Sequence, residues 1–372
     1  GCMANHLPVK KDLKTVIDYL EAKGYEVVLA GKSHVKPNSV FKWTHYFDSI
    51  NHRYLPLEAI DSYLAKVKKP FCLFVTSDFP HGPYPNEGDY TKNDIYTLPY
   101  NGRYIPNYKP GYYQNIKDDN AQLEAVLGMV DSYGLRENSI FIYASDHGIS
   151  GKWGVSEQGL KIPFVVRWPG VVKPGTTSQT MLSLVDVLPT FLDISGSEID
   201  TTIDGKSFYK TLQGDESNVN DYIFSLATKQ NIQACKVFPT RAVRGKRYKF
   251  IRNYNALEVH ESNFGENSVI NSFIKIGAES FPMVPYEELY DLENDPYQKI
   301  NLIKNSKFDA IKSQLSEVLY TWMVSQDDFL ISNHMPLIKP TLHPLDRNSK
   351  WNKVSEENLK GLKSNDYMKS HY

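Results

Sequence analysis

The chain has 372 residues, of which 41% are hydrophobic and 23% charged, and this length and composition predict a folded protein of about two domains. Its 42 basic and 43 acidic residues leave a formal net charge of -1, so no global field attracts nucleic acid or anionic lipid. The longest apolar runs fall short of the ~18 residues of a membrane helix, and we expect neither a nucleic-acid partner nor a membrane span.

The first part of the chain alternates helix-like and strand-like segments. Residues 12–23 carry apolar side chains three and four positions apart, which predicts an amphipathic helix. Strands are predicted at 25–30, 71–75 and 139–144, with a helix at 120–133. Because residues 71–75 are apolar at every position, this strand is typical of a parallel sheet covered on both faces. The pattern therefore predicts an α/β fold.

Residues 85–116 are rich in Pro, Gly, Asn and Tyr without a sustained period, and we interpret them as a long loop over the carboxyl ends of the strands. A further strand is predicted at 163–168. A helix follows at 182–194, in which Pro189 requires a kink or a late start.

The texture of the sequence changes after Gly214. Two short strands around Gly245-Lys246 predict a hairpin within 241–255, followed by a strand at 288–292 and a helix at 310–323. We divide the chain into an α/β part at 1–215, a smaller α+β domain at 216–335, and an extended tail at 336–372.

Polar side chains follow the predicted strands, at the edge where open α/β sheets bind ligands. Asp146 and His147 lie side by side before Gly148 and could bind one metal ion, although a plain surface turn explains them equally well. Lys32 and His34 share a face of an extended segment and could hold an oxyanion. A solvated lysine and a capping histidine are the alternative for that pair. His81 and Lys152 also follow strands, where solvent exposure is the alternative.

Six segments, in the same order along the chain, resemble those of the sulfatase family. They are Gly31-Lys32-Ser33-His34, like the family's G-K-x-H; residues 78–84, like D-P-H-x-P-Y with one insertion; residues 134–148, like its metal-binding strand; residues 152–163, like K-x-x-x-x-E-x-G-x-x-x-P; and residues 241–249 and 289–296, like two signatures of its C-terminal domain.

The resemblance implies an alkaline-phosphatase-like fold, with a mainly parallel sheet flanked by helices and a short antiparallel sheet in the smaller domain. It also implies a calcium ion held by Asp146 and His147 and a formylglycine nucleophile made from Cys or Ser. Lys32 and Lys152 would hold sulfate oxygens, and His34 and His81 would assist the nucleophile or the leaving group. Sulfatases of this kind act on sulfated carbohydrates, so we expect a sulfated glycan as substrate and a periplasmic or secreted location.

Within the family the chain is most similar to heparan N-sulfatases (sulfamidases), in residues 31–37, in 288–291 and around Gln326-Asp327-Asp328. It departs from that branch at His147, where sulfamidases have Asn. A heparan-type saccharide is therefore one candidate substrate, attacked at an O-sulfo or N-sulfo group.

The family's nucleophile segment, C/S-x-P/A-x-R, does not occur in the 372 residues, nor does the strand ending in paired Asp that precedes it. Cys2 is followed by Met3-Ala4-Asn5 and Cys235 by Lys236-Val237-Phe238. We expect this chain by itself to be inactive and an N-terminal segment to complement it. A related phosphoesterase or phosphonate hydrolase, and a non-catalytic protein that binds sulfated glycan, are the alternative functions. The oligomeric state has no sequence signal.

Overall fold

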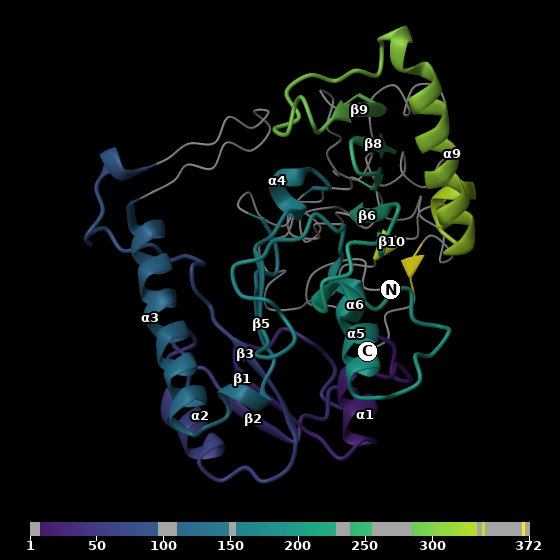
Figure 1. Cartoon of the computed structure of the whole chain (residues 1–372). Helices are drawn as coiled ribbons and strands as arrows, with labels where there is room; N and C mark the ends of the chain where they lie inside the picture. The colour runs from purple at the N-terminus through teal and green to yellow at the C-terminus, as the bar shows by residue number, and fades with distance from the viewer. Residues whose placement is uncertain are drawn as a thin grey trace, which may run out of the picture.

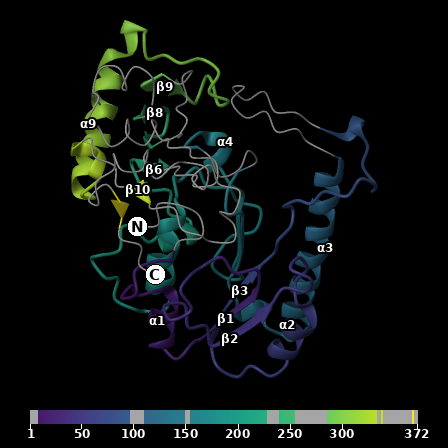
Figure 2. The same cartoon turned by 180° about the vertical axis from the view of Figure 1, so that it is seen from behind.

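The structure, a computed structural model, describes residues 8–95, 110–148, 154–227, 239–254 and 285–332, and the backbone of 337–338 and 367–368. Figure 1 shows two regions: a small parallel sheet with its helices, and an antiparallel sheet with a long helix at the opposite end of the molecule. The same separation is seen from behind in Figure 2.

The parallel sheet has three strands in the order β2-β1-β3. Strand β1 (Glu26–Gly31) lies in the middle, and β2 (His45–Asp48) and β3 (Phe71–Thr76) pair with it in parallel. The sequence predicts β1 and β3 correctly. It gives no signal for β2, because this strand is short, mostly polar and exposed.

Helices cover both faces of β1. Val27 packs against α1 (Val16–Glu21) in one buried cluster, whereas Val28 belongs to a second cluster with α2 (Leu57–Leu64) and α3 (Pro110–Ser132). Consecutive strand residues point to opposite faces, so this continuous apolar run fills two layers of core at once. The arrangement confirms the α/β fold with a parallel sheet between helices.

Helix α3 begins ten residues before the predicted helix at 120–133, so the prediction of a loop throughout 85–116 is wrong from Pro110 onward. A short 3-10 helix, Lys92–Asp94, also lies within that stretch. The first turns of α3 bury polar residues such as Asn115, not an apolar stripe. Hydrophobic periodicity therefore appears only in the second half of the helix.

Strands β4 (Phe141–Ala144) and β5 (Phe164–Arg167) form a separate antiparallel pair. Within the described ranges β4 does not pair with β1 or β3. Of the three strands that we expect to end at one edge of a single sheet, only β1 and β3 therefore belong to the same sheet. Helix α5 (Val187–Ile194) starts late, after a 3-10 turn at Leu184–Asp186, which places Pro189 in its first turn, as the sequence allows.

The antiparallel sheet has the order β6-β7-β8-β9. Its strands are β6 (Ile223–Ala227), β7 (Thr240–Arg244), β8 (Tyr248–Asn253) and β9 (Glu287–Asp291). The hairpin around Gly245-Lys246 and the last strand were predicted. Helix α9 (Asp309–Ser325) packs on one face, where Trp322 stacks on Phe224 with ring centroids 4.8 Å apart.

The remaining elements are α4 (Glu157–Leu160), α6 (Tyr209–Leu212), 3-10 turns at Arg136–Asn138, Ser306–Phe308 and Phe329–Ser332, and the short pair β10 (Leu337–Ile338) and β11 (Tyr367–Met368). Among the helices that the structure describes, none combines the length and the apolar character needed to cross a bilayer. The domain boundaries at 215 and 335 stay predictions.

Candidate functional site

Two predicted site residues follow the ends of β1 and β3. Gly31 approaches β3 so closely that a Cβ atom would lie 2.3 Å from the Thr76 carbonyl oxygen, and its φ is +112°. Only glycine tolerates both conditions. The close contact continues into Lys32, whose amide donates to that same carbonyl at 2.9 Å. Thus the backbone of Lys32 is fixed against the end of β3.

The Lys32 ammonium is paired with a carboxylate. Its Nζ lies 2.6 Å from Oδ1 of Asp78, and the second carboxylate oxygen lies 3.6 Å from Nη1 of Arg53. Lys32 and Asp78 side chains are 28% and 13% exposed. Two cations share one anion here, so this cluster of three side chains has a net positive charge. An anionic ligand suits this balance.

His81 lies in the turn after β3, and its amide donates to the Asp78 carbonyl at 3.0 Å. Nδ1 of its ring lies 2.8 Å from the Gly82 carbonyl oxygen. A proton on Nδ1 satisfies that carbonyl, so Nε2 is the nitrogen that can exchange a proton with a ligand. His81 itself is exposed.

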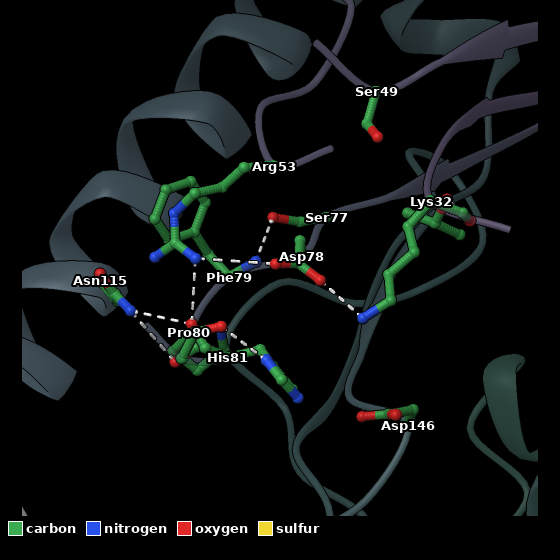
Figure 3. Close-up of polar contacts among 12 residues, drawn as sticks. Lys32, Ser49, Arg53, Ser77, Asp78, Phe79, Pro80, His81, Asn115 and Asp146 are labelled. Atoms are coloured by element: carbon green, nitrogen blue, oxygen red, sulfur yellow. Dashed lines mark hydrogen bonds and ion pairs between the residues drawn. The ribbon is translucent and has the colours of Figure 1, made fainter. Parts of the chain in front are cut away.

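Arg53 and Asn115 hold the same turn, as Figure 3 shows. Arg53 donates to the carbonyls of His81 and Pro83 at 3.3 and 3.1 Å, and its guanidinium carbon lies 4.1 Å from the centroid of the Phe79 ring. The Asn115 amide donates to the His81 carbonyl at 3.0 Å. We did not predict either residue. Asn115 fell in the expected loop, and Arg53 follows no strand of the predicted set.

Asp146 and His147 follow β4 as predicted. The Asp146 side chain is 76% exposed, and His147 Nε2 lies 3.6 Å from its Oδ1. Nδ1 of His147 lies 2.8 Å from the Gly148 carbonyl oxygen, and a proton on Nδ1 leaves a lone pair on Nε2, beside the Asp146 carboxylate, as in metal-binding histidines. Gly148 fits closely against α4, since a Cβ atom would lie 2.3 Å from the Gln158 carbonyl oxygen.

These two donors suit a metal ion but do not complete a calcium site. Calcium takes about six to eight oxygen ligands. In the part of the chain that the structure describes, no group of three or more His, Cys, Asp or Glu side chains could hold a metal. Asp146 lies on the same side of the strand ends as Lys32 and His81 in Figure 3.

His34 and Lys152 complete the predicted set. His34 is exposed, two residues beyond Lys32. Lys152 lies outside the described residues. The structure thus brings Lys32 and His81 together through Asp78 and Arg53, whereas Asp146 and His147 follow a strand of another sheet.

Glu157, from the predicted E-x-G element, ties this region to the antiparallel sheet. Its carboxylate lies 2.7 Å from the Lys249 ammonium and 3.2 Å from the Arg244 guanidinium. Burial alone raises the pKa of Glu157, but the two cations hold it below its ordinary value. Burial lowers the pKa of Lys249. This buried ionic cluster joins the start of α4 to β7 and β8.

Comparisons with known proteins identify relatives of this chain. The sulfatase family profile matches residues 4–197, and the profile described as the C-terminal part of N-sulphoglucosamine sulphohydrolase matches residues 145–264. An ulvan-active sulfatase of Formosa agariphila is 43% identical over 99% of this chain and 77% of its own length. A second ulvan-active sulfatase of that organism is 26% identical over 78% of this chain, which spans only 47% of that relative.

A solved structure supports the fold. The complex of a protein with its substrate D-glucosamine-2-N,6-O-disulfate has a TM-score of 0.64 and 17% identity, covering 88% of this chain and 85% of the other. At that identity the likeness concerns architecture alone, and it confirms the alkaline-phosphatase-like fold class. The family profile and the 43% identical relative together show that the chain belongs to the sulfatase family, whose members are hydrolases of sulfate esters.

Proposed function

We propose that this chain forms the anion-binding and leaving-group side of an active site that removes sulfate from a polysaccharide. The observation that carries the proposal is the pairing of Lys32 with Asp78 beside the His81 turn, at the carboxyl ends of two parallel strands. Ligands bind at such ends in open α/β sheets.

The chemistry of sulfate esters assigns a role to each group. Cleavage of the S–O bond builds negative charge on the leaving oxygen and leaves charge on the other sulfate oxygens. The ammonium of Lys32, and that of Lys152, would hold those oxygens. Nε2 of His81 would donate a proton to the leaving oxygen, while His34 would assist the nucleophile.

We further propose that Asp146 and His147 supply two ligands of a divalent metal, with calcium as the first candidate. The exposed carboxylate of Asp146 and the Nε2 lone pair of His147 beside it support this role. Backbone carbonyls, amide side chains or water would supply the remaining oxygen ligands that calcium needs. A bound divalent cation would neutralise charge on the sulfate group.

The nucleophile is proposed to be a formylglycine in a C/S-x-P/A-x-R segment that is not among the 372 residues. The edges of β3 and β4 support a further strand here, because in the described ranges each has a strand partner on one side only. Residues of β3 are all partly exposed, whereas most of β1 is buried. We infer that a segment complementing this chain pairs at these edges.

Two observations bear on the substrate. The 43% identical relative is named as ulvan-active, whereas the match of residues 145–264 to an N-sulphoglucosamine sulphohydrolase profile supports a heparan-type saccharide. We propose ulvan as the first substrate, since that relative matches almost the whole chain. An exposed Tyr84, edge-to-face with Tyr112 at 6.1 Å, offers a surface on which a sugar ring would stack. A polysaccharide substrate favours a periplasmic or secreted enzyme.

Sulfate release tests the function. The protein is incubated with ulvan, a heparan-type saccharide and 4-nitrophenyl sulfate, both as the 372-residue chain and with the proposed nucleophile segment supplied. We expect release from ulvan only when the segment is present. Turnover of a phosphate diester in place of sulfate would indicate a phosphoesterase, and glycan binding without release would indicate a non-catalytic protein. Release by the chain alone would contradict the proposed nucleophile.

A further inference from the structure

We propose that Arg53 and Asn115 are positioning residues that hold His81 and Lys32 in a common geometry for a sulfate group. The inference rests on the proposed function, because it assigns meaning to those two residues only if they bind sulfate. Its basis is the convergence of both side chains on the backbone of the His81 turn, shown in Figure 3.

The turn has little packing of its own. Phe79 is buried, but His81, Pro83 and Tyr84 are exposed, so hydrophobic burial does not fix the backbone beyond Phe79. Polar contacts must therefore decide where the His81 ring lies. The hydrogen bond between Nδ1 and the Gly82 carbonyl fixes the ring only relative to that backbone.

Asn115 supplies one such contact from α3. The residue is 1% exposed, and its amide nitrogen lies 3.0 Å from the His81 carbonyl oxygen and 3.4 Å from those of Pro80 and Pro83. Because the buried amide of Asn115 contacts three carbonyls of the turn at once, it favours the one backbone conformation that brings them together. Loss of the amide removes its hydrogen bonds to these carbonyls, and such a loss weakens the hold of α3 on the turn.

Arg53, from the segment that follows β2, supplies the second contact. Its two terminal nitrogens donate to the carbonyls of His81 and Pro83, while the plane of the guanidinium lies over the Phe79 ring. Lysine has one nitrogen and no plane, so it cannot make these contacts together. The carbonyl of His81 thus accepts hydrogen bonds from Arg53 and Asn115, which are 62 positions apart in the sequence.

Arg53 also reaches Lys32 through a shared carboxylate. Asp78 places Oδ1 on the Lys32 ammonium and Oδ2 near Arg53. When Arg53 is replaced, Asp78 loses a cation and interacts with Lys32 alone, which reduces the charge that Lys32 offers to an anion. One substitution therefore acts on both groups, whereas replacing Asn115 acts on the His81 turn alone.

Inorganic sulfate is the probe, and the NMR signals of the His81 ring in the 372-residue chain are the readout. Titration gives the dissociation constant of sulfate for the wild type and for R53M, R53K and N115A, and R136M serves as the control. Arg136 is a half-exposed arginine at the other end of β4. Urea unfolding of each variant shows whether the fold is retained, and R53K and N115S replace a variant that does not fold.

We expect R53M and N115A to raise the dissociation constant about tenfold, since each removes hydrogen bonds at a charged or buried group. R53K should lie between R53M and wild type, and R136M should match wild type. If the folded variants bind sulfate as tightly as wild type, Arg53 and Asn115 are not positioning residues. If the wild-type His81 signals do not respond to sulfate, the proposed function itself fails, and the inference with it.

Discussion

The Cys72 thiol is unsuited to act as a nucleophile, because burial raises its pKa to about 12. It lies in β3 and packs against the cluster of Ile17, Leu20 and Val27. In a C2S/C235S background we expect Cys72 to react with a thiol reagent at least about a hundredfold more slowly in the folded than in the unfolded protein. Equal rates in the two states would contradict this. C72S should leave sulfate binding unchanged.

Metal dependence tests Asp146 and His147. We expect calcium to raise the thermal unfolding midpoint of the wild type and a chelator to reverse the rise, because a ligand that binds only the folded state stabilises it. D146N and H147A should abolish the response. E137Q is the matched control, since Glu137 is 79% exposed and lies before the same strand. A full calcium response in D146N would exclude Asp146 as a ligand.

At the scale of single residues, the sequence indicates which side chains come after a strand but not which contacts hold them in place. Lys32 and His81 lie where their strands end, as predicted from the chain pattern. Asp78 was part of the quoted motif, yet its contact with Lys32 depends on the register of β1 and β3. Asn115, Asp119 and Gln122 lie four and three positions apart on one face of α3, and this polar spacing is the signal that was missed.

Buried ion pairs of Glu157 connect α4 to β7 and β8. We expect K249M to lower the free energy of unfolding by about 3–5 kcal/mol, because it leaves the buried Glu157 with Arg244 alone. The double variant E157L/K249M should lose less than K249M. Urea unfolding measures both, with K246M at the exposed turn as the control. If the double variant is less stable than K249M, the loss of stability in K249M does not come from an unpaired buried Glu157 carboxylate.

The end of β9 has a pH-dependent contact with the β7–β8 turn. A hydrogen bond from Arg247 lowers the pKa of Asp291 from its ordinary 3.8 to about 2. Because the pKa of Asp291 is lower in the folded than in the unfolded protein, its ionised carboxylate stabilises the fold at pH values above 3.8. This stabilisation is lost as the pH falls from 3.8 toward 2.

D291N should therefore be less stable than wild type at neutral pH by about 1 kcal/mol, a modest value because Arg247 is 45% exposed. The difference in unfolding free energy, measured with urea, should shrink as the pH falls below 4. E293Q removes the exposed partner of the same arginine, and we expect it to have little effect. If the difference in unfolding free energy between D291N and wild type does not change with pH, the ionisation of Asp291 does not contribute to stability in this range.

At the scale of elements, local patterns predict the antiparallel sheet well. The hairpin at 241–255 has a turn signature at Gly245-Lys246, and its strands pair with each other. The direction of β5 and the separation of β4 from β1 and β3 were not predictable, because pairing between distant strands depends on tertiary packing. The start of α3 was missed for a related reason: polar contacts of Asn115 and Gln122 stabilise it, and these have no apolar period.

At the scale of the whole molecule, the strands of the parallel sheet differ in how many neighbouring strands they have. Strand β1 has a partner on each side, whereas β3 has one within the described ranges. Hydrogen–deuterium exchange of the 372-residue chain should therefore be slower for the amides of β1 than for those of β3. Supplying the proposed nucleophile segment should slow exchange in β3 and leave β6–β9 unchanged. Equal protection of β1 and β3 in the chain alone would contradict an edge open to a further strand.

The His81 turn draws its support from chain segments on both sides of residues 96–109. Arg53 and Asp78 precede that stretch, and Asn115 follows it within α3. Insertions or deletions there therefore need not displace His81, provided that α3 still docks on the turn. A change of length between residues 95 and 110 therefore leaves intact the side-chain contacts that hold the backbone of His81.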